Sequence, residues 1–554
     1  MPLLPFVALF ALPLVALQQP GSTGNLSGLS PDEAVRVVER RLDEGLFQRD
    51  PWMARERGVL QEPVTLGLFG IAGRDVWRTY TDARRAEFGA IVVPRASLER
   101  KLEWNWVRGW LDAESTLLRA RAMEQVDPLA YVRRAERTLA VLVDSDRPSP
   151  EARAIELNRV LLALPNYWKA AQRSLVNPRQ LLAKSALDAL PELVQWMHAI
   201  PEALGDMTWE PTFELLFEQH LRRALAETEA FRGWLEDTLL GMEDYQGTLD
   251  RMRWESVARS LTGRAVDAEE LHARVLQETA ELLMTLRPDD DLPAGNRDEL
   301  EDALVRGSRM GWDLAREIGL FEGDLAVALV PRWTAVRGGL TPALHIANPR
   351  KDSIEVHQAI GTSDEVTLHP GIHPWRRTVA GQRVLGLRHG AIGEAWLVSH
   401  YVRQRADGER LWNEFTLGGL GLYATDWPLR LDPEALDEDI DLMRASLECR
   451  VEEALLLLAA IEIHAMNRTV GRVAESLAQR GGISRASATH LAQQALRDPL
   501  SGLPFLAYET LLQWEAHSTR TRTLEATLAK IYEVVAKHPT AHLNDLYQLD
   551  AKIR

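Results

Sequence analysis

Cysteine is almost absent from this sequence of 554 residues, in which Cys449 is the only one. A single cysteine excludes an intrachain disulfide and any metal site built from several thiolates. Its neighbours form a strongly helical run, so we expect a half-buried and unreactive thiol at this position. The chain does not need disulfides, because its length predicts two to four domains or one large helical body with a sizeable core.

The sequence also lacks dense runs of lysine and arginine. Its formal net charge is −16, and its apolar content of 46% and charged content of 26% are ordinary for a soluble globular protein. Nucleic acids and anionic membrane surfaces attract clustered positive charge. We therefore expect no nucleic-acid partner, and we interpret the negative charge as a source of general solubility.

Long hydrophobic runs are missing everywhere except at the N-terminus. Residues 3–17 form an uncharged apolar run that is shorter than the ~20 residues needed by a membrane-spanning helix. This length predicts a secretory signal peptide over residues 1–18, followed by a flexible spacer over residues 19–30. We expect a periplasmic or secreted protein with no membrane span in the mature chain, and an uncleaved N-terminal anchor is the alternative. No cysteine follows the run, which argues against a lipid-anchored form.

Several familiar catalytic patterns are absent as well. The sequence has no Gly-x-Ser-x-Gly nucleophile turn, and the glycine-rich residues 418–421 lack the Lys-Ser/Thr of a phosphate-binding loop. His369 and His373 have the spacing of zinc ligands on one helix face, but the Pro-Gly pair between them disrupts a helix. The acidic residues 289–291 lack the ligand pattern of a calcium loop, so we interpret them as a solvated linker.

Helical periodicity is the feature that the sequence has in abundance. Apolar residues recur at three- and four-residue spacing over most of the chain. Ser30, Ser149 and Ser484 each precede such a stretch and are expected to be N-caps. Pro165 is expected to break the helix in which it falls. From about residue 324, short β-type runs separated by Pro, Gly and Asn indicate strands.

These patterns predict a mainly α fold, a large multi-helix body with a small β insert. The predicted parts are an N-terminal helical part over residues 31–323, a small β-containing insert over residues 324–385, and a C-terminal helical part over residues 386–554. Within the C-terminal part, residues 385–405 are expected to be helical. No internal repeat of a solenoid period is present.

Residues 389–425 contain the most informative pattern. A block from His389 to Leu397 is followed, about thirty residues later, by a block from Gly418 to Thr425. Other blocks keep the same order along the chain, at Leu161 to Trp168, Val266 to Leu271, Ala460 to His464 and Pro499 to Tyr508. In this order and spacing, residues 150–512 resemble the bacterial domain-of-unknown-function 885 family. That family is helical and related to zinc metallopeptidases, so the resemblance implies a metallopeptidase-like body.

The resemblance also assigns a role to each motif position. His389 matches the first zinc histidine, while Tyr423 and His464 match a tyrosine and a histidine that the family's later blocks contain. Catalytic zinc needs about three protein ligands and an open water position. The other positions are lost: Gly390 replaces the general-base glutamate, Ala395 the second histidine, Gly418 the third-ligand glutamate, Ala460 an aspartate and Phe505 a tyrosine. We therefore expect a vestigial site or cleft with no catalytic residue, no metal and no cofactor.

Three functions stay open at this point. The first is an exported, non-catalytic relative of these peptidases that keeps a peptide-sized cleft and binds peptide or cell-envelope components. The second is an active peptidase or hydrolase with no metal or with rearranged ligands, and the third is a purely structural helical scaffold. A filled interior around His389 and Tyr423 would favour the scaffold. The rearranged ligands would come from His369, His373, Glu394, His400, Glu414 and His464.

Overall fold

The computed structural model describes residues 26–552 of the chain with several gaps. The gaps are residues 57–62, 144–148, 177–179, 206–208, 240–247, 287–291, 293, 321–325, 332–343, 349–352, 359–372, 391, 395, 398–412, 432–438 and 539–540. The predicted signal peptide over residues 1–18 therefore lies outside the described residues. The same is true of His369, Ala395 and His400.

Helices make up most of the described chain, which confirms the predicted mainly α fold. Those before the strands are α1 (Pro31–Arg49), α2 (Pro51–Glu56), α3 (Gly70–Ala90), α4 (Leu98–Ala120), α5 (Met123–Val126), α6 (Pro128–Val143), α7 (Pro150–Ser174), α8 (Gln180–Ala203), α9 (Pro211–Leu239), α10 (Arg251–Thr262), α11 (Ala268–Thr285) and α12 (Arg297–Glu317). Those after the strands are α13 (Val379–His389), α15 (Glu414–Ala424), α16 (Trp427–Leu431), α18 (Ile440–Ala460), α19 (Val470–Gly481), α20 (Arg485–Arg497), α21 (Leu503–Ser518), α22 (Leu524–Lys537) and α23 (Leu543–Lys552).

Three short strands lie between these two groups of helices. They are β1 (Ala326–Pro331), β2 (Leu344–Asn348) and β3 (Ser353–Gln358), in the order β1-β3-β2. β3 pairs in parallel with β1, so that Ala326 lies opposite Ser353, and antiparallel with β2. Helix α13 already begins at Val379, inside the bounds predicted for the β insert. A separate β insert over residues 324–385 stays a prediction.

The predicted helix starts are confirmed at their caps. The Ser30 side chain accepts a hydrogen bond from the Glu33 amide, and the Glu33 side chain accepts one from the Ser30 amide. Ser149 and Ser484 cap α7 and α20 in the same way through their side-chain oxygens. The predicted break at Pro165 is wrong, because α7 continues through it. A proline inside a helix costs about 3 kcal/mol, which the buried side chains around it offset.

The helix predicted over residues 385–405 is interrupted after His389; Glu394, Trp396 and Leu397 are helical again, and residues 398–405 lie outside the described part of the chain. α13 ends at His389, and Gly390 follows it as the C-cap with a non-helical backbone. The first motif block therefore begins at the end of α13, and the second block lies along α15.

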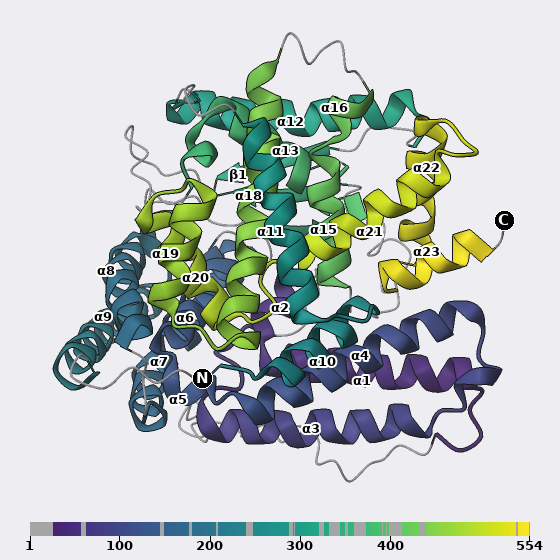
Figure 1. Ribbon diagram of the computed structural model, residues 1–554. Coiled ribbons are helices and arrows are strands. Elements are labelled where there is room, and N and C mark those ends of the chain that lie inside the picture. Colours follow the sequence, from purple (N-terminus) through teal and green to yellow (C-terminus); the bar gives the residue numbers. More distant parts are fainter. Residues whose placement is uncertain are drawn as a thin grey trace.

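Apolar packing divides the described residues into three clusters. One holds α1, α3 and α4, which lie along the bottom in Figure 1, and a second holds α6 to α9 at the left. The largest cluster surrounds α15, α18 and α21 and also takes residues from α10, α11 and α12. This cluster therefore contains residues that precede the strands in the sequence and residues that follow them. No helix of the described part of the chain is long and apolar enough to cross a membrane.

Candidate functional site

The predicted zinc histidine, His389, lies at the end of α13 and contacts a carboxylate. His389 Nδ1 is 2.8 Å from Oε2 of Glu394, five residues further along the chain. The neighbouring Arg388 donates to Glu453 of α18 at 2.6 Å, and its Nε lies 3.8 Å from Glu394. Burial alone would lower the pKa of Arg388, but the charge of Glu453 raises it well above its ordinary value. Two carboxylates thus balance the basic end of this helix.

Gly390, which the resemblance aligns with the general-base glutamate, has no room for a side chain. A Cβ atom added to Gly390 would lie closer than 3.0 Å to the carbonyl oxygen of Gly386 and to Oγ of Ser308 on α12. Gly386 is itself pressed against α12, where an added Cβ would lie 2.8 Å from the Ser308 amide nitrogen. Close approach of two helix backbones requires such small residues. The absence of a side chain at Gly390 therefore allows α12 and α13 to pack closely together.

The second motif block packs just as closely. A Cβ at Gly418, where the family has its third ligand, would lie 3.0 Å from Pro504 of α21. At Gly421 an added Cβ would be 2.9 Å from the carbonyl oxygen of Arg388 and 2.9 Å from Cγ of Glu394. The block around His389 thus lies directly against α15. The spacing that produced the resemblance corresponds here to a real contact between the two blocks.

Tyr423 belongs to a polar network inside the largest cluster. It is fully buried, and its hydroxyl donates to Glu515, which also pairs with Arg430. Burial and the charge of Glu515 raise the pKa of Tyr423 well above its ordinary value. Asp426 continues the network: it is 2% exposed and accepts hydrogen bonds from Tyr508 (2.6 Å), Arg430 (3.1 Å) and Ser446 (3.2 Å). Every carboxylate of this network meets several donors, as a stable buried network requires.

His464 lies in a π-helical turn, Ile461–Ala465, at the end of α18. Its side chain is fully buried. Nδ1 accepts a hydrogen bond from the Leu249 amide at 3.2 Å, and Nε2 is 2.9 Å from the carbonyl oxygen of Ala495. These partners require the neutral tautomer with the proton on Nε2. With both nitrogens engaged, this histidine joins three segments of backbone and presents no free lone pair to a metal.

The described residues do not converge on a metal site. The partners of His389, Tyr423 and His464 lie on different elements, and no group of three or more His, Cys, Asp and Glu in the described ranges could hold a metal ion. From the rearranged ligand set, His373 has its Nδ1 3.7 Å from Glu448. His369 and His400 lie outside the described residues, so a ligand set that includes them stays untested.

Large aromatic side chains fill the interior around the two blocks. Trp396 and Trp427 pack on the ring of Tyr532 with centroid distances of 4.9 and 4.8 Å. The Tyr532 hydroxyl donates to the carbonyl oxygen of Ile392 at 2.7 Å, between the blocks. Tyr423, Trp427 and Tyr532 have no exposed surface. Such packing is typical of a protein core. Residues 391, 395 and 398–412 lie outside the described part of the chain, so a peptide-sized cleft beside these side chains stays untested.

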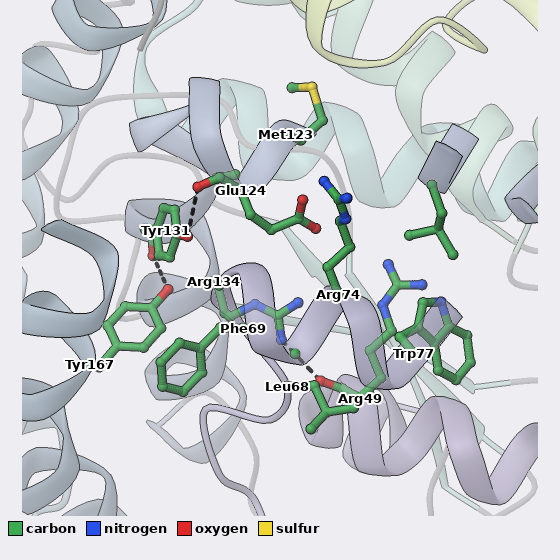
Figure 2. A pocket seen from close by; sticks show the side chains of 14 residues that line it. Arg49, Leu68, Phe69, Arg74, Trp77, Met123, Glu124, Tyr131, Arg134 and Tyr167 are labelled. Carbon is green, nitrogen blue, oxygen red and sulfur yellow. Dashed lines mark hydrogen bonds between the residues drawn. The ribbon is translucent and has the colours of Figure 1, made fainter. Parts of the chain in front are cut away.

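A cavity of about 120 Å³ lies elsewhere, between the start of α3 and helices α5, α6 and α7. Figure 2 shows the Glu124 carboxylate pointing into it, with the guanidinium groups of Arg49, Arg74 and Arg134 around this carboxylate. Arg134 donates to the carbonyl oxygen of Arg49 at 3.0 Å. Burial raises the pKa of Glu124, although the three arginine charges oppose this shift. The cavity is therefore polar, and it combines charges of both signs.

The sequence contained no recognisable signal for this cavity. Its charged residues come from α1, α3, α5 and α6, which are separate helices in the sequence. Arginine, glutamate and tyrosine at helical spacing usually indicate a solvated or half-buried face. Only the packing of the helices brings these side chains together.

The chain resembles two solved structures over almost its whole length. One is "a putative lipoprotein of unknown function from Shewanella oneidensis", with 12% identity, a TM-score of 0.63, and coverage of 94% of this chain and 100% of the other. The other is "the putative lipoprotein from Colwellia psychrerythraea", with 12% identity, a TM-score of 0.72, and coverage of 94% and 98%. At this identity the likeness shows a shared fold. No family model and no curated protein matches the chain.

Proposed function

We propose that this protein is an exported, cell-envelope scaffold in which the positions of a metallopeptidase-like centre stabilise a helical core. The observation that carries the proposal is the packing at Gly390, where contact between α12 and α13 leaves no space for the general base. The neutral His464, buried between two backbone partners, supports it further. A metallopeptidase needs both a base and several ligands on one open cleft.

Export is supported by two independent observations. The apolar run over residues 3–17 has the length of a signal peptide. The two similar structures are described as those of "putative" lipoproteins, and lipoproteins are a class of exported envelope proteins. Cys449 is buried within α18, so it is not available for a lipid. The partner of such a scaffold would be another component of the envelope. Descent from the domain-of-unknown-function 885 family is part of the same proposal.

Metal content and peptide turnover test this proposal together. The purified chain is equilibrated with zinc and dialysed, its zinc is measured by elemental analysis, and a mixed peptide library is incubated with it. We expect well below one zinc per chain and no cleavage. His389→Ala is the matched variant: retention of about one zinc per chain that this variant loses, or cleavage that it abolishes, would refute the proposal.

A further inference from the structure

We propose that the cavity beside α3 binds a small zwitterion of the α-amino-acid class, with the ligand carboxylate on Arg74 and its ammonium group on Glu124. The cavity is lined by residues of the two N-terminal clusters, such as Trp77 and Tyr131. Tyr423 belongs to the third cluster. This site is therefore independent of the scaffold role proposed above.

The first step of the argument is the balance of charges around the cavity. Two of its three arginines already form ion pairs with other carboxylates of the chain. Arg134 lies 2.6 Å from Asp50, and Arg49 lies 3.1 Å from Asp50 and 2.6 Å from Glu114. Trp77 donates to the same Glu114 at 2.7 Å, which completes this arrangement. The remaining guanidinium is that of Arg74, and the remaining carboxylate is that of Glu124.

These two remaining groups form no hydrogen bond or ion pair with each other. Nε of Arg74 and Oε2 of Glu124 are both buried and have no hydrogen-bond partner, and no ion pair links the two residues within the described chain. Arg74 lies 4.0 Å from its chain neighbour Asp75, which is half exposed. A buried charge without a partner is costly. A ligand that carried one charge of each sign would satisfy both groups at once.

The opposite charges of Arg74 and Glu124 determine which kind of ligand the cavity can bind. A simple anion would approach Arg74 but would be repelled by Glu124, and a simple cation would meet three guanidinium groups. The start of α3 adds to the positive side, because Phe69 at its N-cap makes no side-chain capping bond. The uncapped N-terminus of a helix of 21 residues favours a carboxylate. An α-amino acid carries its carboxylate and ammonium groups only one carbon apart.

The walls of the cavity limit the size of the ligand. A volume of about 120 Å³ is of the same order as the roughly 150 Å³ of a cavity that holds benzene. The hydroxyls of Tyr131 and Tyr167 donate to the carbonyl oxygens of Glu124 (2.9 Å) and Tyr131 (2.8 Å), as Figure 2 shows. Phe69 packs edge-on against Tyr167 at 4.6 Å. The rings therefore form a rigid apolar wall suited to a short side chain, as in glycine, alanine or serine.

Calorimetric titration of the full chain tests this site with glycine, L-alanine and L-serine as probes. Acetate and methylammonium serve as half-ligands that each carry only one of the two charges. We expect at least one of the amino acids to bind, and both half-ligands to bind at least about tenfold more weakly. Absence of binding by all three amino acids at about 10 mM, or acetate binding as tightly as the best amino acid, would overturn the proposal.

Two variants locate the binding. Arg74→Gln and Glu124→Gln are each expected to weaken binding by about 30-fold or more, because each leaves one ligand charge unpaired. Arg78→Gln is the matched control, since Arg78 lies one turn further along α3 and its side chain is 40% exposed. This variant should bind the amino acids with the same affinity as the unmodified chain. Unchanged affinity in both cavity variants refutes the assignment. If a variant fails to fold, as judged by circular dichroism, the half-ligand comparison on the unmodified chain decides alone.

Discussion

Gly390→Ala is the most direct perturbation of the contact on which the scaffold proposal depends. The added methyl would overlap the Gly386 carbonyl oxygen and Ser308 Oγ, and it would lie 2.9 Å from Ser308 Cβ. Ordinary contact between carbon atoms begins at about 3.5 Å. The hydroxyl of Ser308 can rotate away, but its Cβ is fixed by α12 and the carbonyl by α13. The strain must therefore be taken up by movement of the two helices.

The size of the effect follows from the cost of overpacking. One extra methylene in a well-packed core typically costs 1–3 kcal/mol, and here the obstacle is mainly backbone, so we expect a loss of about 2–3 kcal/mol in the free energy of unfolding. Gly233→Ala is the control, since it lies inside α9 and an added Cβ there meets no atom within 4 Å. Replacing such a helical glycine should stabilise the protein by about 0.5–1 kcal/mol.

Urea denaturation of the two variants and the unmodified chain, followed by circular dichroism, measures both effects as shifts of the midpoint. The expected signs are opposite, which separates a local clash from a general response to alanine. A Gly390→Ala variant within about 0.5 kcal/mol of the unmodified chain would show that α12 and α13 separate easily. Position 390 could then hold a longer side chain, and the reasoning against a general base there would fail.

Three further outcomes are expected. Asp426→Asn should lower the free energy of unfolding, measured by urea denaturation, by about 3–5 kcal/mol, because it leaves buried arginine charges unbalanced. Tyr508→Phe should lower it by only about 1–2 kcal/mol, because it removes one hydrogen bond to Asp426. Equal losses would contradict the central role of Asp426 in this network. Burial would raise the pKa of Glu452, but Arg376 and His373 lower it from 4.5 to about 2. The Glu452 carboxylate therefore contributes about 3 kcal/mol of stability, which is fully present above about pH 5 and is lost as the pH falls toward 2. The difference in stability between the unmodified chain and Glu452→Gln should disappear over that range. A difference that does not change with pH would contradict this assignment. Burial raises the pKa of Cys449 to about 11, so its thiol should react with a disulfide reagent only after denaturant is added, and rapid labelling of the folded chain would disprove this.

Local features were the most predictable part of this fold. The caps at Ser30, Ser149 and Ser484 depend on a few neighbouring residues, and the sequence located all three. Pro165 was misjudged because its local cost is outweighed by burial of its neighbours, which no short window of sequence reveals. The end of α13 at His389 depends on Gly390, whose role is set by a contact with α12.

The sites were less predictable than the helices. The two blocks around His389 and Tyr423 were expected to be near each other, and Gly421 does lie against Glu394. The partners of His464, Leu249 and Ala495, are separated from it by 215 and 31 positions, so the sequence could not show that both its nitrogens are used. The cavity at Arg74 and Glu124 was missed entirely, since it exists only where residues of six helices meet.

The charge groups at Asp426 and at Glu124 differ in a way that bears on their roles. Asp426 meets two arginines, a tyrosine and a serine, as expected of a carboxylate that only stabilises the fold. Glu124 faces three arginines across a cavity and still has an oxygen without a donor. Stability alone would favour closing that gap, because an unpaired buried charge destabilises the folded state. Strained or unsatisfied groups concentrate where a protein binds something, so the cavity beside α3, and not the positions predicted to be a vestigial zinc site, is where a ligand should be sought.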